Sequence, residues 1–273
     1  MTAVDDAQDL QQAQAELIVL LLSELDVLWD QLDIANPSES LEAWIEAATS
    51  VIQEYAVMAG ALSQELYLDA REDAGAESEF DPAPIDPPSE EQIESVLRWA
   101  TSELWTGGSV EDARDRLDAG AEKLVLDTAR DTTAADSIED PAAAGWARIA
   151  RPDACYWCAM LATRGVKDGR GVYSDRDTAL IAGPGSKRSG KSYHDNCRCV
   201  AVPIFQGQDY KAPAYVQQWW ELWNSSTKGK SGDEAMNAFR RALHPQRKDA
   251  INERRRARYA KRKNAERAQQ AAA

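Results

Sequence analysis

Hydrophobic residues recur at helical spacing through the first third of the chain, and acidic residues fill the opposite face. The run from Leu10 to Ile34 predicts one amphipathic helix, and a second is expected over residues 37–70. Between them, Asn36 has the position of a helix cap and Pro37 that of the first helical residue, with Glu39 able to answer the cap. Two such helices joined by a few residues predict an antiparallel hairpin whose aromatic residues lie in its core.

The helical pattern breaks over residues 74–89, where four prolines and four acidic residues exclude a helix and predict a linker. Ser89 begins a capping box for a helix that should end at Gly107-Gly108. Ser109 begins another helix, expected to end at about Arg130 before a polar break. The sequence PAAAGWARIAR, residues 141–151, is interpreted as a further short helix.

The pattern of the sequence changes after Asp153, from long helices to shorter elements that carry the cysteines. A short helix is expected from Cys155 to Ala162, and the sequence CRCVAVPIF after residue 196 has the character of a strand. Helices are expected again after Tyr210, first one with an aromatic stripe that favours a core or an interface, then one that ends at Leu243. A basic helix is expected from about Pro245 onward.

These elements predict a mainly α fold with a small α+β Cys/His module, a helical hairpin at the N-terminus and a basic helical tail. The expected organisation is an acidic hairpin over 1–73, a linker over 74–89, the module with its Cys/His cluster over 90–210, and the helical, basic tail over 211–273.

The charge of the chain is strongly polarised along its length. The net charge is −15, yet residues 1–97 hold 23 acidic residues and one basic residue, whereas residues 240–267 hold 12 basic and three acidic residues. Two ends of opposite charge suggest different partners, or attraction to each other or to neighbouring copies; the alternative is two solvated helical faces.

Membrane insertion and secretion are not expected. The longest apolar run, Leu17 to Leu22, has six residues, well below the about 18 of a membrane span. The acidic N-terminus differs from the basic start of a secretory signal. We therefore expect a soluble protein of a reducing compartment, in which four clustered cysteines indicate a metal or a local pairing rather than a disulfide scaffold.

One motif is misleading. Residues Gly185 to Ser192 match G-x-x-x-x-G-K-S, the P-loop pattern, but that loop needs a feeding strand and a following helix. The preceding apolar run is only the four residues 179–182, and the residues after Ser192 begin no helix. A nucleotide site is therefore not expected.

The cysteines are the strongest chemical pattern. A tetrahedral zinc ion takes four nitrogen or sulfur ligands. The chain offers a C-x-x-C pair, a C-x-C pair and a histidine three residues before the latter. The C-x-C spacing departs from the usual second pair, which leaves the histidine as ligand or as outer donor. Three alternatives stay open: a structural metal such as zinc, metal-free thiol packing, or a disulfide. The candidate ligands are Cys155, Cys158, His194, Cys197 and Cys199.

Catalysis is not expected from these residues. His194 and His244 are the only histidines, so a cysteine or serine nucleophile has few bases to draw on. A dyad of Cys155 and His194 oriented by Asp195 is conceivable, but four clustered cysteines favour a structural role. No G-x-S-x-G motif occurs in the chain.

Several of these residues together resemble a known family. Gly145-Trp146, the C-x-x-C-A-M-L-A run from Cys155, Gly165, Tyr173 and the H-x-x-C-R-C-x-x-x-P run from His194 to Pro203 are similar to the MuF-like minor capsid proteins of tailed phages. This group is also called the phage head morphogenesis family, and its actinobacterial-phage version looks closest. The resemblance covers about residues 90–205.

The resemblance implies a virion component of the phage head, present in few copies and in the host cytoplasm during assembly. It would associate with the portal and with other capsid or scaffold proteins, and influence DNA packaging or ejection. No catalytic residue is carried over. Because neighbouring or fused genes of related phages can encode a capsid maturation protease, that activity is the first alternative.

The basic tail fits a polyanionic partner. Its charges can neutralise phosphates without reading sequence, and its single aromatic residue, Tyr259, argues against base stacking. A zinc-stabilised nucleic-acid-binding module is therefore the second alternative. The rival is electrostatic docking on an acidic protein surface, such as the portal or another copy. The candidate contact residues are Arg254, Arg255, Arg256, Arg258, Lys261, Arg262 and Lys263.

Overall fold

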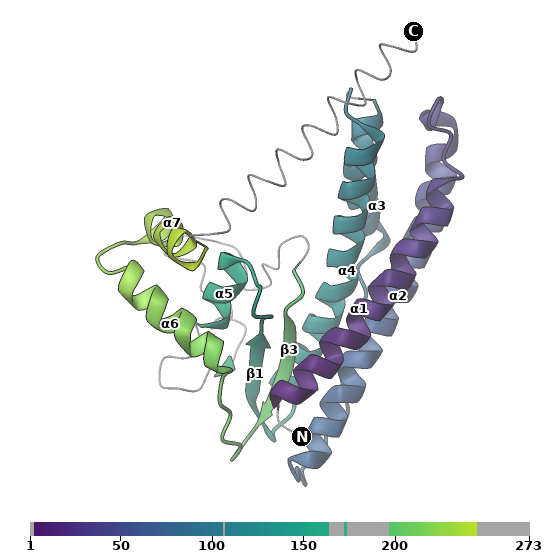
Figure 1. Ribbon diagram of the computed structural model, residues 1–273. Coiled ribbons are helices and arrows are strands. Elements are labelled where there is room, and N and C mark those ends of the chain that lie inside the picture. The colour runs from purple at the N-terminus through teal and green to yellow at the C-terminus, as the bar shows by residue number, and fades with distance from the viewer. Residues whose placement is uncertain (1–2, 106, 164–171, 174–196, 245–273) are drawn as a thin grey trace. The chain divides into compact units, whose positions relative to one another are not determined.

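A computed structural model describes residues 3–105, 107–163, 172–173 and 197–244 (Figure 1). The chain divides into two compact units, residues 1–217 and 218–273, and the boundary falls within a helix. The described part is mainly helical, with a small sheet and a cysteine cluster, which is the fold class that the sequence predicts. None of the described helices is long and apolar enough to cross a membrane. The predicted basic helix lies outside the described residues, and the domain limits stay a prediction.

The first unit begins with the expected hairpin. Helix α1 (Ala3–Trp29) and helix α2 (Pro37–Asp73) lie side by side (Figure 1) and share a core in which Leu21 and Ile52 are fully buried. The rings of Trp29 and Trp44 meet edge to face with centroids 5.8 Å apart. The aromatic residues thus lie in the core, as predicted.

The connection of the hairpin differs from the prediction at two points. Helix α1 stops at Trp29 instead of Ile34, because the Asp33 carboxylate accepts hydrogen bonds from the backbone N–H groups of Ala35 and Asn36 and holds a turn. The side chain of Asn36 donates to Asp33 rather than capping α2. The predicted Asn cap is therefore wrong, whereas the helix does begin at Pro37.

The proline-rich segment over residues 74–89 contains no helix, as its composition predicts, and it lies against the helices. The Ala83 backbone N–H donates to the Asp136 carboxylate at 3.0 Å, and the Gln64 amide donates to the Ala83 carbonyl at 2.9 Å. These bonds fix the segment against α2, which carries Gln64, and against the helix that carries Asp136.

Two capped helices follow. Helix α3 (Glu90–Thr101) runs into the short 3-10 turn η1 (Ser102–Leu104), and helix α4 (Val110–Glu139) comes next. The hydroxyl groups of Ser89 and Ser109 accept from the backbone N–H three residues on, at 3.2 and 2.9 Å. The predicted cap at Ser89 and the predicted helix start at Ser109 are therefore confirmed.

The predicted end of α4 at Arg130 is wrong, since the helix continues to Glu139. The hydroxyl groups in its last turns donate to carbonyls four residues earlier instead of breaking the helix, and this face is buried. Burial against α2 outweighs the low helix propensity of these residues. They are Thr128, Thr132, Thr133 and Ser137.

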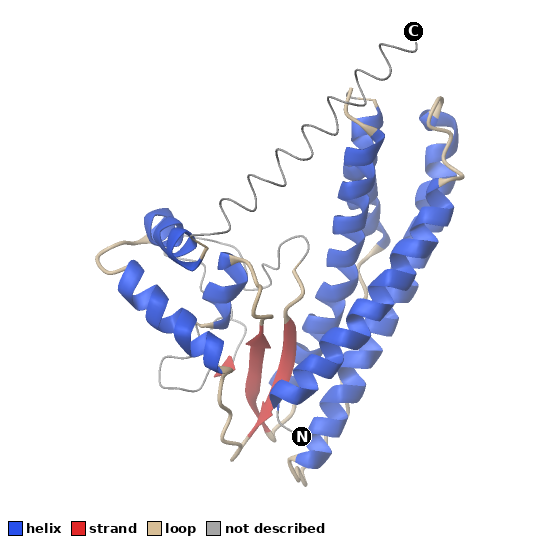
Figure 2. Ribbon diagram, in the orientation of Figure 1, coloured by secondary structure: helices blue, strands red, loops and turns tan. Residues whose placement is uncertain are grey.

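The small sheet has the order β2-β1-β3 and is antiparallel throughout (Figure 2). Its strands are β1 (Ala143–Ile149), β2 (Val172–Tyr173) and β3 (Val200–Phe205). Helices α1 and α4 pack against β3, and α4 also packs against β1.

The helix predicted over 141–151 is wrong, because Ala143–Ile149 forms the central strand β1. Five consecutive residues of β1 are buried, and its register pairs Ile149 with Val200 and Ala147 with Val202. Pairing with the β-branched residues of β3 decides the conformation here, and local propensity does not. The strand predicted after residue 196 and the short helix α5 (Tyr156–Ala162) are both confirmed.

The remaining helices are α6 (Ala214–Ser226) and α7 (Gly232–Leu243), as expected. In the second unit, the rings of Trp223 and Phe239 meet with centroids 5.1 Å apart, and Phe239 is fully buried. Trp223, one of the aromatic residues of the predicted stripe, therefore serves packing.

Candidate metal centre

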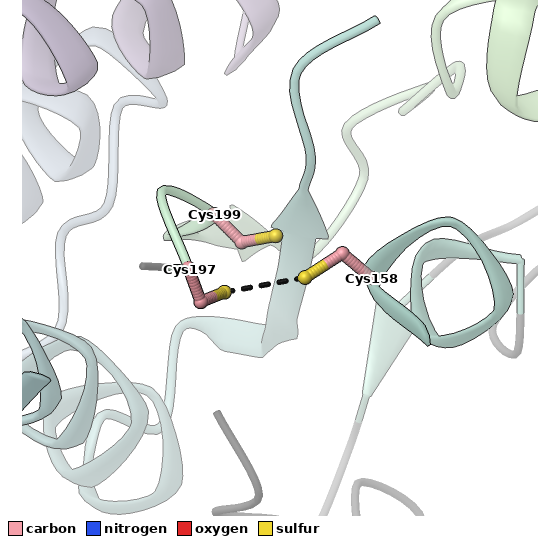
Figure 3. A group of neighbouring side chains, drawn as sticks. All are labelled: Cys158, Cys197 and Cys199. Carbon is pink, nitrogen blue, oxygen red and sulfur yellow. Dashed lines mark hydrogen bonds between the residues drawn. The ribbon is translucent and has the colours of Figure 1, made fainter. Parts of the chain in front are cut away.

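Three cysteine thiols converge in the first unit (Figure 3). Cys158 comes from α5, whereas Cys197 and Cys199 come from the segment that leads into β3. Their sulfur atoms all lie within 4.8 Å of one another, and those of Cys158 and Cys197 are 3.2 Å apart. All three side chains are buried.

The antiparallel pairing of β1 with β3 explains this convergence. Ile149, at the end of β1, lies opposite Val200, at the start of β3. The chain leaves β1 at this end of the sheet and reaches α5 a few residues later. It enters β3 at the same end, directly after Cys199. Two cysteine pairs about 40 residues apart in sequence are thus brought to one end of the sheet, with Cys158 and Cys197 separated by 39 positions.

Of the five predicted ligands, the structure brings three together. Cys155 stands one turn before Cys158 at the N-cap of α5, where its sulfur accepts a hydrogen bond from the Cys158 backbone N–H at 3.5 Å. Its side chain is partly exposed. His194 lies outside the described residues, as do the P-loop-like run from Gly185 and the basic residues 254–263.

A buried arginine holds the segment that carries two of the thiols. Arg130 of α4 donates from Nε to the Cys199 carbonyl at 2.8 Å and from Nη2 to the Cys197 carbonyl. Its side chain is only 1% exposed, and Nη1 lies 3.0 Å from the Asp127 carboxylate. Sequence reasoning missed Arg130, because the residue stands where the helix was expected to end. If the helix had been predicted to continue past residue 130, Arg130 would have been placed on its buried face, and a buried arginine indicates a specific partner.

The surroundings shift the pKa values of the three thiols in different directions. Contacts with the Cys158 and Cys199 thiols, together with the positive charges of Arg130 and Arg148, lower the pKa of Cys197. Contact with Cys155, then with Cys197, raises the pKa of Cys158. For Cys199 the contact with Cys158 lowers the pKa, but contact with Cys197 and burial outweigh it and raise the pKa to about 12.

This arrangement is chemically suited to a soft cation or to thiol packing. Converging sulfurs in a buried setting, beside fixed positive charge, form a donor set typical of a structural metal. Metal ligation by these residues stays a prediction, and so do the metal-free and disulfide alternatives.

Comparison with known proteins locates the chain among phage proteins. A family model described as "VG15 protein" matches residues 1–226. The "Gene 15 protein" of Mycobacterium phage D29 is 28% identical over 197 residues, which cover 60% of this chain and 70% of that relative. The "Gene 15 protein" of Mycobacterium phage L5 is 26% identical over 205 residues, which cover 57% of this chain and 70% of the relative. No solved structure matches the chain.

Proposed function

Because the chain belongs to the VG15 protein family and is a phage-encoded protein, we propose that it is a minor capsid protein that acts in head morphogenesis. In this role it associates with the portal and with other capsid or scaffold proteins, and it influences DNA packaging or ejection. The resemblance to MuF-like proteins, stated from the sequence, is the basis for these details; the family match itself extends only to a phage protein.

The main support for the proposal is that the two halves of the motif shared with MuF-like proteins pack against each other. The C-x-x-C-A-M-L-A half forms α5, and the C-R-C half precedes β3, yet the thiols of both halves meet. Met160 and Leu161, from the first half, are also buried. The motif residues therefore serve to build a module, which supports a structural role over a catalytic one.

A second feature supports protein partners. Helix α1 exposes large apolar side chains, with Val19 at 67%, Leu20 at 58% and Val27 at 63%. Leu20 and Val27 are seven residues apart and share one face of α1, and apolar side chains exposed on a helix face favour a protein–protein contact site. We assign the contact with other head proteins to this apolar stripe, defined by Val19, Leu20 and Val27.

The experiment is a phage that lacks this gene, complemented by plasmid-borne variants and examined by electron microscopy and infectivity. We expect the deletion to yield defective or non-infectious heads, and the wild-type gene to restore them. Leu20→Glu with Val27→Glu should fail to restore infectivity although the purified variant folds. Ala43→Glu, at an exposed site on α2, is the matched control and should restore it.

Two outcomes oppose the proposal. Normal numbers of infectious virions without the gene would contradict a role in head assembly. Head proteins that stay uncleaved without the gene, and that the purified chain cleaves in vitro, would replace it with the capsid maturation protease. Mass spectrometry of head proteins from both phages separates these outcomes.

A further inference from the structure

We infer that Cys155, Cys158, Cys197 and Cys199 bind one structural zinc ion as four thiolates, and that Arg130 positions the C-x-C half of this site. This inference does not rest on the proposed function, because it follows from the geometry and charge around the sulfurs.

The positions of the sulfurs fit the ion. A tetrahedral zinc with Zn–S bonds of about 2.3 Å separates its sulfur ligands by about 3.8 Å. The three buried sulfurs lie within 4.8 Å of one another, and the pair of Cys158 and Cys197 is at 3.2 Å. Side-chain adjustments of less than about 1 Å bring them to the spacing of the ion.

Cys155 supplies the fourth sulfur. It lies at the N-cap of α5, one turn before Cys158. Its sulfur already accepts the backbone N–H of Cys158 at 3.5 Å, and such a donor stabilises a thiolate. A ligand pair from one helical turn then faces a ligand pair from the C-x-C segment.

The charge of the surroundings matches four thiolates. Zn²⁺ with four thiolates carries a net charge of −2, which is costly in a buried setting without nearby positive charge. Arg130 and Arg148 are both buried, and Arg148 lies opposite Ala201, two residues beyond Cys199. Arg130 also fixes the carbonyl groups of Cys197 and Cys199, so that both sulfurs approach from a held backbone. Outer contacts of this kind orient metal ligands.

The ion would stabilise the fold by cross-linking two of its elements. It would join the start of α5 to the start of β3 and close the chain between Cys158 and Cys197, which are 39 positions apart. A cross-link that closes a long loop limits the unfolded chain more than the folded one. The segment after β1 and the segment before β3 would then be held together by the metal as well as by strand pairing.

The test starts from the full chain, purified under reducing conditions without added metal. Elemental analysis should find one zinc per chain, and a thiol reagent should react with four thiols only after a chelator is added. Replacement by Co²⁺ should give the absorption of a tetrahedral four-thiolate site. Absence of zinc with four reactive thiols would overturn the inference, and so would two thiols lost to a disulfide.

Variants identify the ligand set. Cys155→Ser should weaken zinc binding by more than the roughly 10–100-fold that follows from loss of an outer contact, whereas His194→Ala should leave it unchanged. Arg130→Lys should weaken binding by roughly 10–100-fold while keeping the four-thiolate Co²⁺ spectrum. Loss of metal in His194→Ala, with retention in Cys155→Ser, would overturn the four-thiolate assignment. The Co²⁺ spectrum of the wild-type chain decides the number of thiolates even where a variant fails to fold.

Discussion

Replacing Arg130 by leucine removes a buried guanidinium that holds two cysteine carbonyls. The side chain is 1% exposed, and it donates to the carbonyls of Cys199, at 2.8 Å, and Cys197. A hydrogen bond from a charged donor contributes about 1.5–3 kcal/mol, so the two bonds amount to about 3–6 kcal/mol. Arg130→Leu also removes one of the two cations that contact the Asp127 carboxylate, which adds to the loss of stability. It removes the desolvation cost of the buried guanidinium as well, which offsets part of that loss. We expect the free energy of unfolding to fall by about 3–5 kcal/mol.

The assay is urea denaturation followed by circular dichroism, at pH 7 with a reducing agent. Arg130→Lys keeps the charge but not the fork geometry, so its free energy of unfolding should lie between those of wild type and Arg130→Leu. The control is Arg98→Leu, which breaks an exposed ion pair with Glu42 and should leave the midpoint unchanged. A loss below about 1 kcal/mol in Arg130→Leu would refute the reasoning, because the two bonds would then contribute little.

The remaining predictions concern α4. Burial, followed by the charge of Asp26, raises the pKa of Asp118 to about 6, so its contribution to stability is present below about pH 4 and is lost as the pH rises through 6. Asp118→Asn should therefore raise the urea midpoint at pH 7 and not at pH 4, and an equal rise with the exposed Glu111→Gln would contradict this. A Cβ on Gly120 would lie 2.5 Å from the Val96 Cγ1 atom, so Gly120→Ala should cost about 1–3 kcal/mol. Adding Val96→Ala should recover part of that loss in the same urea assay; simple additivity of the two losses would count against the contact. Ser109→Ala should lower thermal stability by about 1 kcal/mol, and an unchanged melting temperature would mean that this cap contributes nothing.

The sequence is most informative where the interactions are local. The hairpin, the caps at Ser89 and Ser109, and the helix after Cys155 each depend on residues within one or two turns. The meeting of Cys158 with the C-x-C pair could also be anticipated, since a tetrahedral sulfur site would take ligands from both motifs.

The sequence misleads where distant contacts decide the outcome. Ala143–Ile149 reads as a helix because it is rich in alanine, and only pairing with β3 makes it a strand. The last turns of α4 read as a break because threonine has low helix propensity, and burial overrides this. Arg130 could not be recognised as part of the site, because its partners are carbonyl groups 67 and 69 positions away.

The most direct test of a head-assembly role is quantitative mass spectrometry of gradient-purified virions and of empty heads. We predict that the protein is present in both, in few copies compared with the major capsid protein, and that the Leu20→Glu, Val27→Glu chain is depleted while the Ala43→Glu chain is retained. Absence of the wild-type chain from virions and heads alike, although it is abundant in infected cells, would contradict the account.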